Sequence, residues 1–224
     1  MTTKLIVNAD DFGCCAGVNR GIVEAHEQGI VTSASLMVNR PAAGEAARLA
    51  LDRPGLDVGL HVELRRWRAP ARLVRTLAAR ELEKQLGRFR RLLGRDPTHL
   101  DSHHNAHRSE PLRPLFAALA EELRVPLRHF SDTVRFCGEF YGHDGRGRPD
   151  EASIRPEALV ELLRRLSPGV TELGTHPGYT DGLGEWYCAE RVQEVRALCD
   201  PRVRDAIEEL GVEITSFREL SGER

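Results

Sequence analysis

The sequence alternates short apolar, β-branched runs with segments whose apolar residues recur at helical spacing, and this alternation constrains the fold more than any other feature. The strand patterns lie at residues 4–10, 31–38, 56–64, 98–104, 125–130, 170–179 and 212–217. The helical patterns lie at residues 17–30, 41–54, about 80–94, 111–125, 155–166, 190–200 and 201–210. Strands that alternate with helices predict an α/β fold with a parallel sheet and helical crossovers. We expect a Gly-rich, aromatic loop at 135–149, and periodicity alone leaves an open sheet and a closed barrel as alternatives.

The composition narrows the classes of partner. The chain has 224 residues, of which 41% are hydrophobic and 29% charged, and this suits one large domain or two small ones. Its formal charge of -2 gives no bulk attraction to nucleic acid or to an anionic membrane, so we expect a small molecule or a second copy of the chain as partner. The N-terminal apolar run is too short for a signal peptide, and no stretch of about 18 apolar residues occurs, so we expect a cytoplasmic protein.

Several common catalytic signatures are missing from the sequence. There is no GxSxG elbow, and no GxGxxG or GxxxxGK[ST] loop follows a predicted strand, which argues against a serine hydrolase, a dinucleotide enzyme and a P-loop nucleotidase. The five cysteines form no CxxC pattern, which argues against a zinc knuckle and a disulfide framework. We interpret Cys14 and Cys15 as small fillers at a loop-to-helix junction, with a cysteine nucleophile as the alternative.

The segment LIVNADDFG, residues 5–13, ends an apolar run on two adjacent carboxylates, Asp10 and Asp11. Two like charges side by side at the end of a buried strand require a proton or a metal ion to hold them together. The other polar groups at predicted strand ends are His61, residues 101–104 and His176. Because sites in parallel α/β folds lie at the carboxyl ends of strands, we expect these side chains to converge.

The residue types at these strand ends favour a metal-dependent hydrolase. The candidate ligands and catalytic groups are Asp10, Asp11, His61, His103, His104, His107 and His176. Two histidines and one aspartate suit a divalent ion such as zinc and leave positions open for water and substrate, while a second carboxylate can accept the proton of the water. Two alternatives remain: residues 101–107 can be a polar loop that caps the next helix, and the aspartates can be stabilised by a helix N-terminus.

Five segments in order resemble the YdjC-like carbohydrate deacetylases, a family that includes chitooligosaccharide deacetylase. The segments are NADDFG at 8–13, GIVTSASLMVN at 29–39, GLH at 59–61, THLDSHHNAH at 98–107 and THPGY at 175–179. The resemblance spans nearly the whole chain and therefore implies one domain over residues 1–224. It also implies a TIM-barrel-like (β/α) fold, distorted or incomplete, that removes the acetyl group of an N-acetylated amino sugar with one divalent ion, Mg²⁺ or Zn²⁺.

The resemblance further implies a role for each matched residue. Asp11, His61 and His103 match the metal ligands of the family, and Asp10 matches the general base that activates the water. His176 in the THPG motif matches the general acid that protonates the departing amine. Relatives of this kind also suggest a homodimer.

Substrate identity is the part of the function that the sequence defines least. The chain has Asn105 where the family usually has a third consecutive histidine, and Glu63 where it usually has an asparagine. Arg65, with Arg66 and Arg68, indicates either an anionic sugar conjugate or a solvated rim. The aromatic residues that can stack on a sugar, with packing in the core or in loops as the alternative, are Tyr141, Phe140, Tyr179, Trp186 and Tyr187. The alternative functions are a metal-dependent esterase or phosphodiesterase on a related conjugate, and a catalytically inactive sugar-binding protein.

Overall fold

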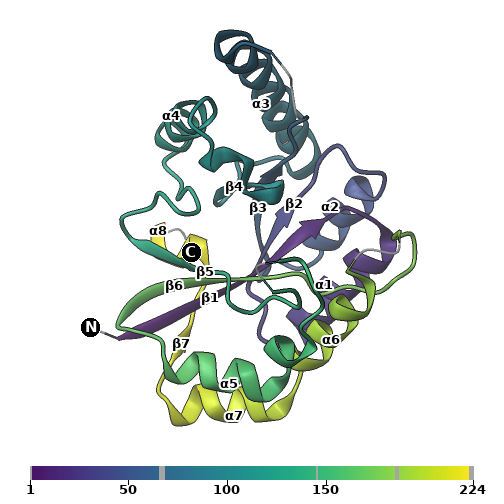
Figure 1. The fold of residues 1–224 in the computed structure, drawn as a ribbon, viewed down its shortest axis with the longest axis vertical. Coiled ribbons are helices and arrows are strands. Elements are labelled where there is room, and N and C mark those ends of the chain that lie inside the picture. Colours follow the sequence, from purple (N-terminus) through teal and green to yellow (C-terminus); the bar gives the residue numbers. More distant parts are fainter. Residues whose placement is uncertain (1, 66–68, 145, 185–186, 222–224) are drawn as a thin grey trace.

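The computed structural model describes residues 2–65, 69–144, 146–184 and 187–221, and its centre is one curled parallel sheet flanked by helices (Figure 1). The strands are β1 (Thr3–Phe12), β2 (Ser33–Leu36), β3 (Asp57–Val62), β4 (Leu100–Ser102), β5 (Val134–Cys137), β6 (Gly169–Thr175) and β7 (Glu213–Ile214). Their order is β4-β3-β2-β1-β6-β5, and β7 pairs with the beginning of β1. Because β4 and β5 are the two edges, the barrel does not close within the described ranges. The expected TIM-barrel-like but incomplete (β/α) fold is confirmed.

Strand β1 is buried on both faces, as is typical of a strand in a parallel sheet. Leu5 and Val7 belong to the large core that the sheet forms with the surrounding helices, whereas Ile6 faces the inside of the curl and packs with Phe217. Side chains two positions apart along a strand share a face, so Asp10 lies on the inner face with Ile6. The apolar run therefore fixes the sheet and directs a carboxylate to the mouth of the curl.

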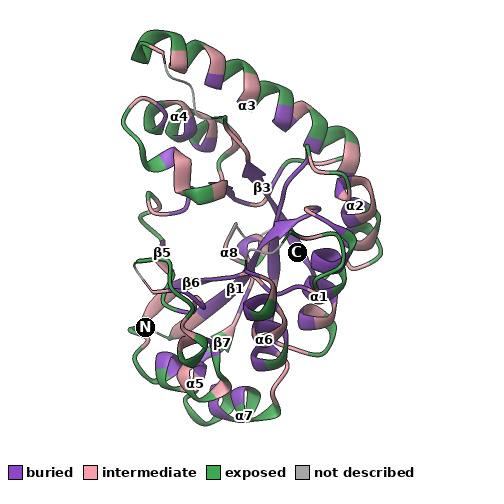
Figure 2. Ribbon diagram, turned by 45° about the vertical axis from the view of Figure 1, so that its right-hand side comes forward, coloured by how far each residue is buried: buried purple, intermediate pink, exposed green. Residues whose placement is uncertain are grey.

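Helices cover the outside of the sheet (Figure 1). They are α1 (Ala16–Glu27), α2 (Ala43–Leu51), α3 (Ala71–Leu93), α4 (Arg113–Leu123), α5 (Pro156–Arg164), α6 (Cys188–Leu198) and α7 (Pro201–Glu209), with 3-10 turns at His103–Arg108 and Glu151–Ile154. The short last helix, α8 (Phe217–Ser221), instead contributes Phe217 to the cluster with Ile6 inside the curl. In Figure 2 the strands β1–β4 and β6 are mostly buried, β5 and β7 are more exposed, and the helices expose their outer faces. None of the helices in the described ranges is long and apolar enough to cross a membrane.

Helix α1 packs closely on the loop that follows β6. A Cβ atom on Gly21 would lie 2.5 Å from the Cα atom of Gly178, a distance that real side chains do not adopt. Gly21 therefore permits a backbone approach that no other residue at this position would allow. The contact sets the path of the chain directly after β6.

The structure corrects four of the predicted elements. Residues 125–130 form only a single bridge, from Leu127 to Leu100, because Pro126 has no N–H for a ladder and His129 has a left-handed φ of 66°. The fifth strand is instead β5, inside the segment that we expected to be a loop. Helix α3 begins at Ala71, well before residue 80, and the last strand is reduced to the two residues of β7.

Candidate metal centre and active site

Asp10 and Asp11 face the same cavity because β1 has a bulge near its end. In a regular strand adjacent side chains point to opposite faces, so two successive aspartates would not share a site. The pairing with β2 shifts register between Ala9 and Phe12, and Asp11 has a φ of 68°, in the left-handed region. Such a backbone conformation is costly for a residue other than glycine and is characteristic of functional sites. The bulge thus explains how two successive aspartates can point into the same cavity.

Asp11, His61 and His103 form a group that fits a metal ion. One potential ligand atom from each lies within 4.8 Å of the other two. Asp11 Oδ1 is 3.5 Å from His61 Nε2 and 3.2 Å from His103 Nδ1, and it is a buried atom without a hydrogen-bond partner among the described residues. An orphaned carboxylate oxygen facing two imidazole nitrogens is what a divalent cation would satisfy.

Asp101 fixes the orientation of His61. The His61 Nδ1–H group donates to Asp101 Oδ1 at 2.7 Å, which leaves Nε2 directed toward Asp11. Metal-binding histidines commonly donate their other ring N–H to a carboxylate in this way. Burial lowers the pKa of His61, but Asp101 and Asp10 raise that pKa by more, so it lies well above its usual value.

The second oxygen of Asp11 is bound by Arg191 of α6. Arg191 Nη2 donates to Asp11 Oδ2 at 2.5 Å, and Nη1 donates to the carbonyl oxygen of His176 at 3.2 Å. Burial raises the pKa of Asp11, but the neighbouring imidazoles of His103 and His61 and the charge of Arg191 outweigh burial and hold that pKa well below 3.8. Asp11 is therefore ionised and offers Oδ1 alone to the cavity.

Asp10 is held by a buried arginine. Arg128 donates from Nη1 to Asp10 Oδ2 at 2.7 Å and from Nη2 to Oδ1 at 2.8 Å, a bidentate arrangement, and Asn8 Nδ2 donates to Oδ1 at 2.9 Å. Burial raises the pKa of Asp10, and Arg128 more than offsets it, so the pKa lies below 3.8. Asp10 is consequently an ionised, oriented carboxylate that Arg191 does not contact.

Arg128 is shared among three buried carboxylates. Besides Asp10, its Nη2 atom lies 2.8 Å from Asp101 Oδ2 and 2.6 Å from Glu172 Oε1. One cation cannot compensate three anions fully, and burial raises the pKa of Glu172 to about 7 despite this contact. The cluster connects the base candidate Asp10 with Asp101, the partner of the ligand candidate His61.

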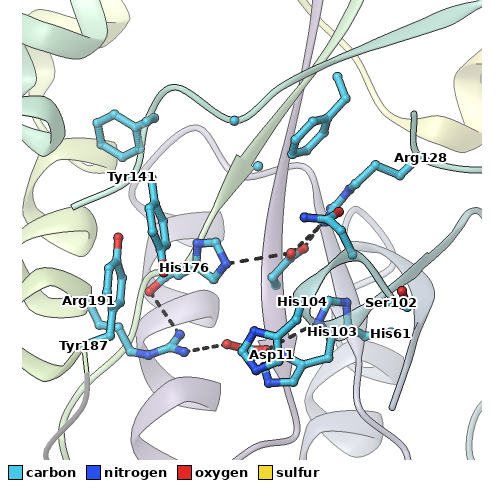
Figure 3. Close-up of a pocket in the computed structure, with 16 residues that line it drawn as sticks. Asp11, His61, Ser102, His103, His104, Arg128, Tyr141, His176, Tyr187 and Arg191 are labelled. Atoms are coloured by element: carbon cyan, nitrogen blue, oxygen red, sulfur yellow. Dashed lines mark hydrogen bonds and ion pairs between the residues drawn. The ribbon is translucent and has the colours of Figure 1, made fainter. Parts of the chain in front are cut away.

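His176 lies directly after β6 and faces Asp10, with Nε2 3.8 Å from Asp10 Oδ2. Burial lowers the pKa of its imidazole to about 4 although Asp10 raises it, so the ring is neutral at neutral pH. Figure 3 shows His176 flanked by Tyr141 and Tyr187 on one side, with Asp11 beyond it on the other.

These residues line one cavity of about 460 Å³ at the carboxyl ends of the strands (Figure 3). Its polar lining is Asp10, Asp11, His61, Ser102, His103, His104, Asn105, Arg128, His176 and Arg191. Four aromatic residues also line the cavity, of which Tyr141 and Tyr187 lie beside His176 while Phe136 packs against Arg128; the fourth is Phe140. The arrangement can place a polar reacting group against the aspartates while an apolar ring face packs on the aromatic side.

Comparison with known proteins gives the family. The family model described as YdjC-like protein matches residues 4–209. The chain belongs to this family. A carbohydrate deacetylase of Geobacillus stearothermophilus is 39% identical, with 98% of this chain and 99% of that protein covered. A chitooligosaccharide deacetylase of Serratia marcescens is 34% identical, with 98% of this chain and 100% of that protein covered. The resemblance drawn from the five sequence segments is confirmed.

Solved structures agree with the fold. A protein from Enterococcus faecalis, proposed to cleave cellobiose phosphate, superposes with a TM-score of 0.82 at 28% identity and covers 98% of this chain and 99% of its own. A family 4 carbohydrate esterase from Streptomyces lividans, solved with acetate, has a TM-score of 0.57 at 14% identity, covering 95% of this chain and 91% of its own. The second likeness concerns the fold alone.

The structure brings most of the sequence-derived site residues of this YdjC-like chain together. All five residues to which we gave catalytic or ligand roles line the cavity, namely Asp10, Asp11, His61, His103 and His176. Of the residues expected near the substrate, Tyr141, Phe140 and Tyr187 line it as well. Arg65 is exposed and is not part of the lining, and the Tyr179 hydroxyl donates to Glu24 of α1 at 2.7 Å, also outside it. Arg66, Arg68 and Trp186 lie outside the described residues.

The sequence did not indicate Arg128 and Arg191 as site residues, and it suggested His107, which lies outside the cavity. Arg128 lies in the segment that we expected to be a strand, and a cation inside a strand pattern was a usable signal for a buried partner. Arg191 is buried on α6, where the sequence pattern of the helix gave no sign of it. His107 does not line the cavity: its Nε2 donates to the carbonyl oxygen of Arg128 at 3.1 Å, and its Nδ1 lies 2.7 Å from Ser102 Oγ.

Proposed function

We propose that this protein is a metal-dependent hydrolase that removes the acetyl group from the nitrogen of an N-acetylated amino sugar, releasing acetate and a free amine. The observation that carries the proposal is the orphaned Asp11 Oδ1 atom facing His61 and His103, with the arginine-bound carboxylate of Asp10 beside it. The names of the Geobacillus and Serratia relatives support the same reaction class.

The metal would be held by Asp11 Oδ1, His61 and His103. When bound, a divalent ion there polarises the acetyl carbonyl and lowers the pKa of water. Two imidazoles and a single carboxylate oxygen favour Zn²⁺ over Mg²⁺, which prefers a shell of oxygens. Arg191 contributes by keeping Asp11 ionised and by occupying its other oxygen.

Asp10 is the general base of the proposed reaction. It accepts a proton from the water whose oxygen attacks the acetyl carbon, and Arg128 keeps the carboxylate ionised and pointed at the cavity. The two adjacent aspartates thus have separate tasks, one as a ligand and one as a base. Their separate arginine partners support this division.

His176 completes the proton transfer. Its imidazole is neutral at rest, because burial lowers its pKa to about 4, so it must take up a proton before it can donate one. Asp10, 3.8 Å away, receives a proton in the first step and is the donor in this scheme. His176 then protonates the nitrogen as the carbon–nitrogen bond breaks.

The sugar packs on the aromatic side of the cavity in this proposal. Tyr141 lines the cavity next to His176, with ring centroids 5.3 Å apart, and an aromatic face suits the apolar face of a pyranose. Arg65 is exposed, and we assign it to the solvated rim.

Acetate release tests the proposed function. Chelator-treated protein is reloaded separately with Zn²⁺ and Mg²⁺ and incubated with N-acetylglucosamine mono- and oligosaccharides, and in parallel with an O-acetylated sugar. We expect metal-dependent acetate release from the N-acetylated compounds, higher with Zn²⁺. Release from the O-acetylated sugar alone would replace the amidase by an esterase, and no metal binding by calorimetry would favour a sugar-binding protein.

A further inference from the structure

Helix α6 has charged residues on its buried face, where the other helices have mostly apolar ones. Glu190, Arg191 and Glu194 are all buried on this helix, and Glu194 has no exposed surface. A carboxylate of this kind is costly to bury unless several donors satisfy it. Burial raises the pKa of Glu194 to about 7, which shows how strongly the surroundings resist its charge.

Both oxygens of Glu194 accept short hydrogen bonds from the neighbourhood of the cavity. Oε2 accepts from the backbone N–H of His176 at 2.5 Å, and Oε1 accepts from the Tyr187 hydroxyl at 2.6 Å. The Tyr187 oxygen in turn accepts from the backbone N–H of Gly142 at 2.6 Å. Glu194 itself does not line the cavity and therefore has no contact with a substrate there.

Among the described residues, the imidazole of His176 has no hydrogen-bond partner to hold it. Its Nδ1 atom is buried without a partner among the described residues, and its Nε2 atom is 3.8 Å from Asp10. The backbone of His176, in contrast, is bound on both sides, at N–H by Glu194 and at C=O by Arg191. The place of the ring in the cavity is thus defined through the backbone.

We propose that Glu194 is the positioning residue of His176, and that Tyr187 fixes the Glu194 carboxylate for this task. The proposal rests on the acid role of His176 in the proposed function. Tyr187 also links the Glu194 carboxylate to the backbone N–H of Gly142, the residue after Tyr141. Glu194 therefore sets the distance between His176, the proposed proton donor, and the ring of Tyr141, which we expect to contact the sugar.

Three variants test the positioning role kinetically. Glu194→Leu leaves the His176 N–H and the Tyr187 hydroxyl without an acceptor, and we expect kcat to fall roughly 10- to 100-fold with KM within about twofold. Glu194→Gln keeps one oxygen for the His176 N–H, so we expect kcat within about fivefold of the wild type. Arg196→Gln, at an exposed position of the same helix, is the matched control and should leave both constants unchanged. Equal kcat values for the wild type and the leucine variant, measured on folded protein, would overturn the proposal.

A measurement that needs no turnover separates this proposal from the proposed function. In the metal-free wild type, the His176 amide proton should resonate far downfield and exchange slowly with solvent, as a short bond to a buried carboxylate requires. An ordinary chemical shift with fast exchange would refute the Glu194 contact, even if Glu194→Leu failed to fold. If the wild type released no acetate at all, the proposed function would fail, and with it the positioning role, while a downfield amide would still establish the contact.

Discussion

Removing the cation that Asp10, Asp101 and Glu172 share should destabilise the fold strongly. Arg128→Met keeps an unbranched side chain up to the ε position but leaves three buried carboxylates without their common guanidinium; the Arg128 side chain is 3% exposed. Removing one partner of a buried ion pair lowers the free energy of unfolding by about 3 to 5 kcal/mol. Because domains of this kind are stable by about 5 to 15 kcal/mol, the variant should lose a large part of its free energy of unfolding.

Urea denaturation at pH 7 measures this loss. Arg128→Lys retains the charge without the bidentate geometry, so its free energy of unfolding should fall less than that of Arg128→Met. The control is Arg164→Met, which breaks an exposed pair with Glu161 and should change the free energy by at most about 0.5 kcal/mol. A loss below about 1 kcal/mol in Arg128→Met would refute the view that this arginine compensates the cluster.

The loss of stability in Arg128→Met should also depend on pH. In the wild type the pKa of Asp10 lies below its unfolded value of 3.8, so its contribution to stability is present above pH 3.8 and is lost as the pH falls further. In Arg128→Met the largest opposing cause is gone, so burial and the charge of Asp101 raise the pKa of Asp10 against His61 alone, and Asp10 then destabilises the fold at neutral pH. The stability difference between the two proteins should shrink from pH 7 toward pH 4, and the acid limb of kcat/KM should move to higher pH. A constant difference over this range would contradict the argument.

Two further substitutions test contacts that hold the site in place. Asp101→Asn should weaken metal binding by about 10- to 100-fold in calorimetry, because the carboxylate that orients His61 is lost; unchanged affinity would exclude that role. Gly21→Ala should destabilise the protein by about 1 to 3 kcal/mol, because the added methyl group overlaps Gly178, whereas Gly87→Ala within α3 should be neutral or stabilising. Equal unfolding midpoints for the two alanine variants would contradict the close approach of α1 to the loop after β6.

The sequence predicted the sheet and the residues at its mouth because both follow from local patterns. Strand and helix periods predict the α/β class, and the position of sites at the carboxyl ends of parallel strands predicts that Asp10, His61 and His176 lie together. The segment of Arg128 was predicted less well, since Pro126 and a left-handed His129 replace an expected strand by a bridge.

The sequence could not give the partners that act across the fold. The bulge that turns Asp11 toward Asp10 leaves no mark that periodicity detects. The contact of Asp11 with Arg191 joins residues 180 positions apart, and Glu194 meets His176 only once α6 has packed against the segment that follows β6. Such pairs depend on tertiary packing, and no local pattern encodes them.

The division of labour between the two aspartates is the central claim, and a matched pair of variants tests it most directly. Asp10→Asn and Asp11→Asn each remove one negative charge and keep the shape of the side chain. Bound metal and acetate release from an N-acetylglucosamine disaccharide are measured on the same reloaded samples. We predict that Asp11→Asn loses most of its metal together with acetate release, whereas Asp10→Asn keeps its metal and loses turnover. An Asp10→Asn protein that releases acetate at nearly the wild-type rate, or an Asp11→Asn protein with a full complement of metal, would contradict the claim.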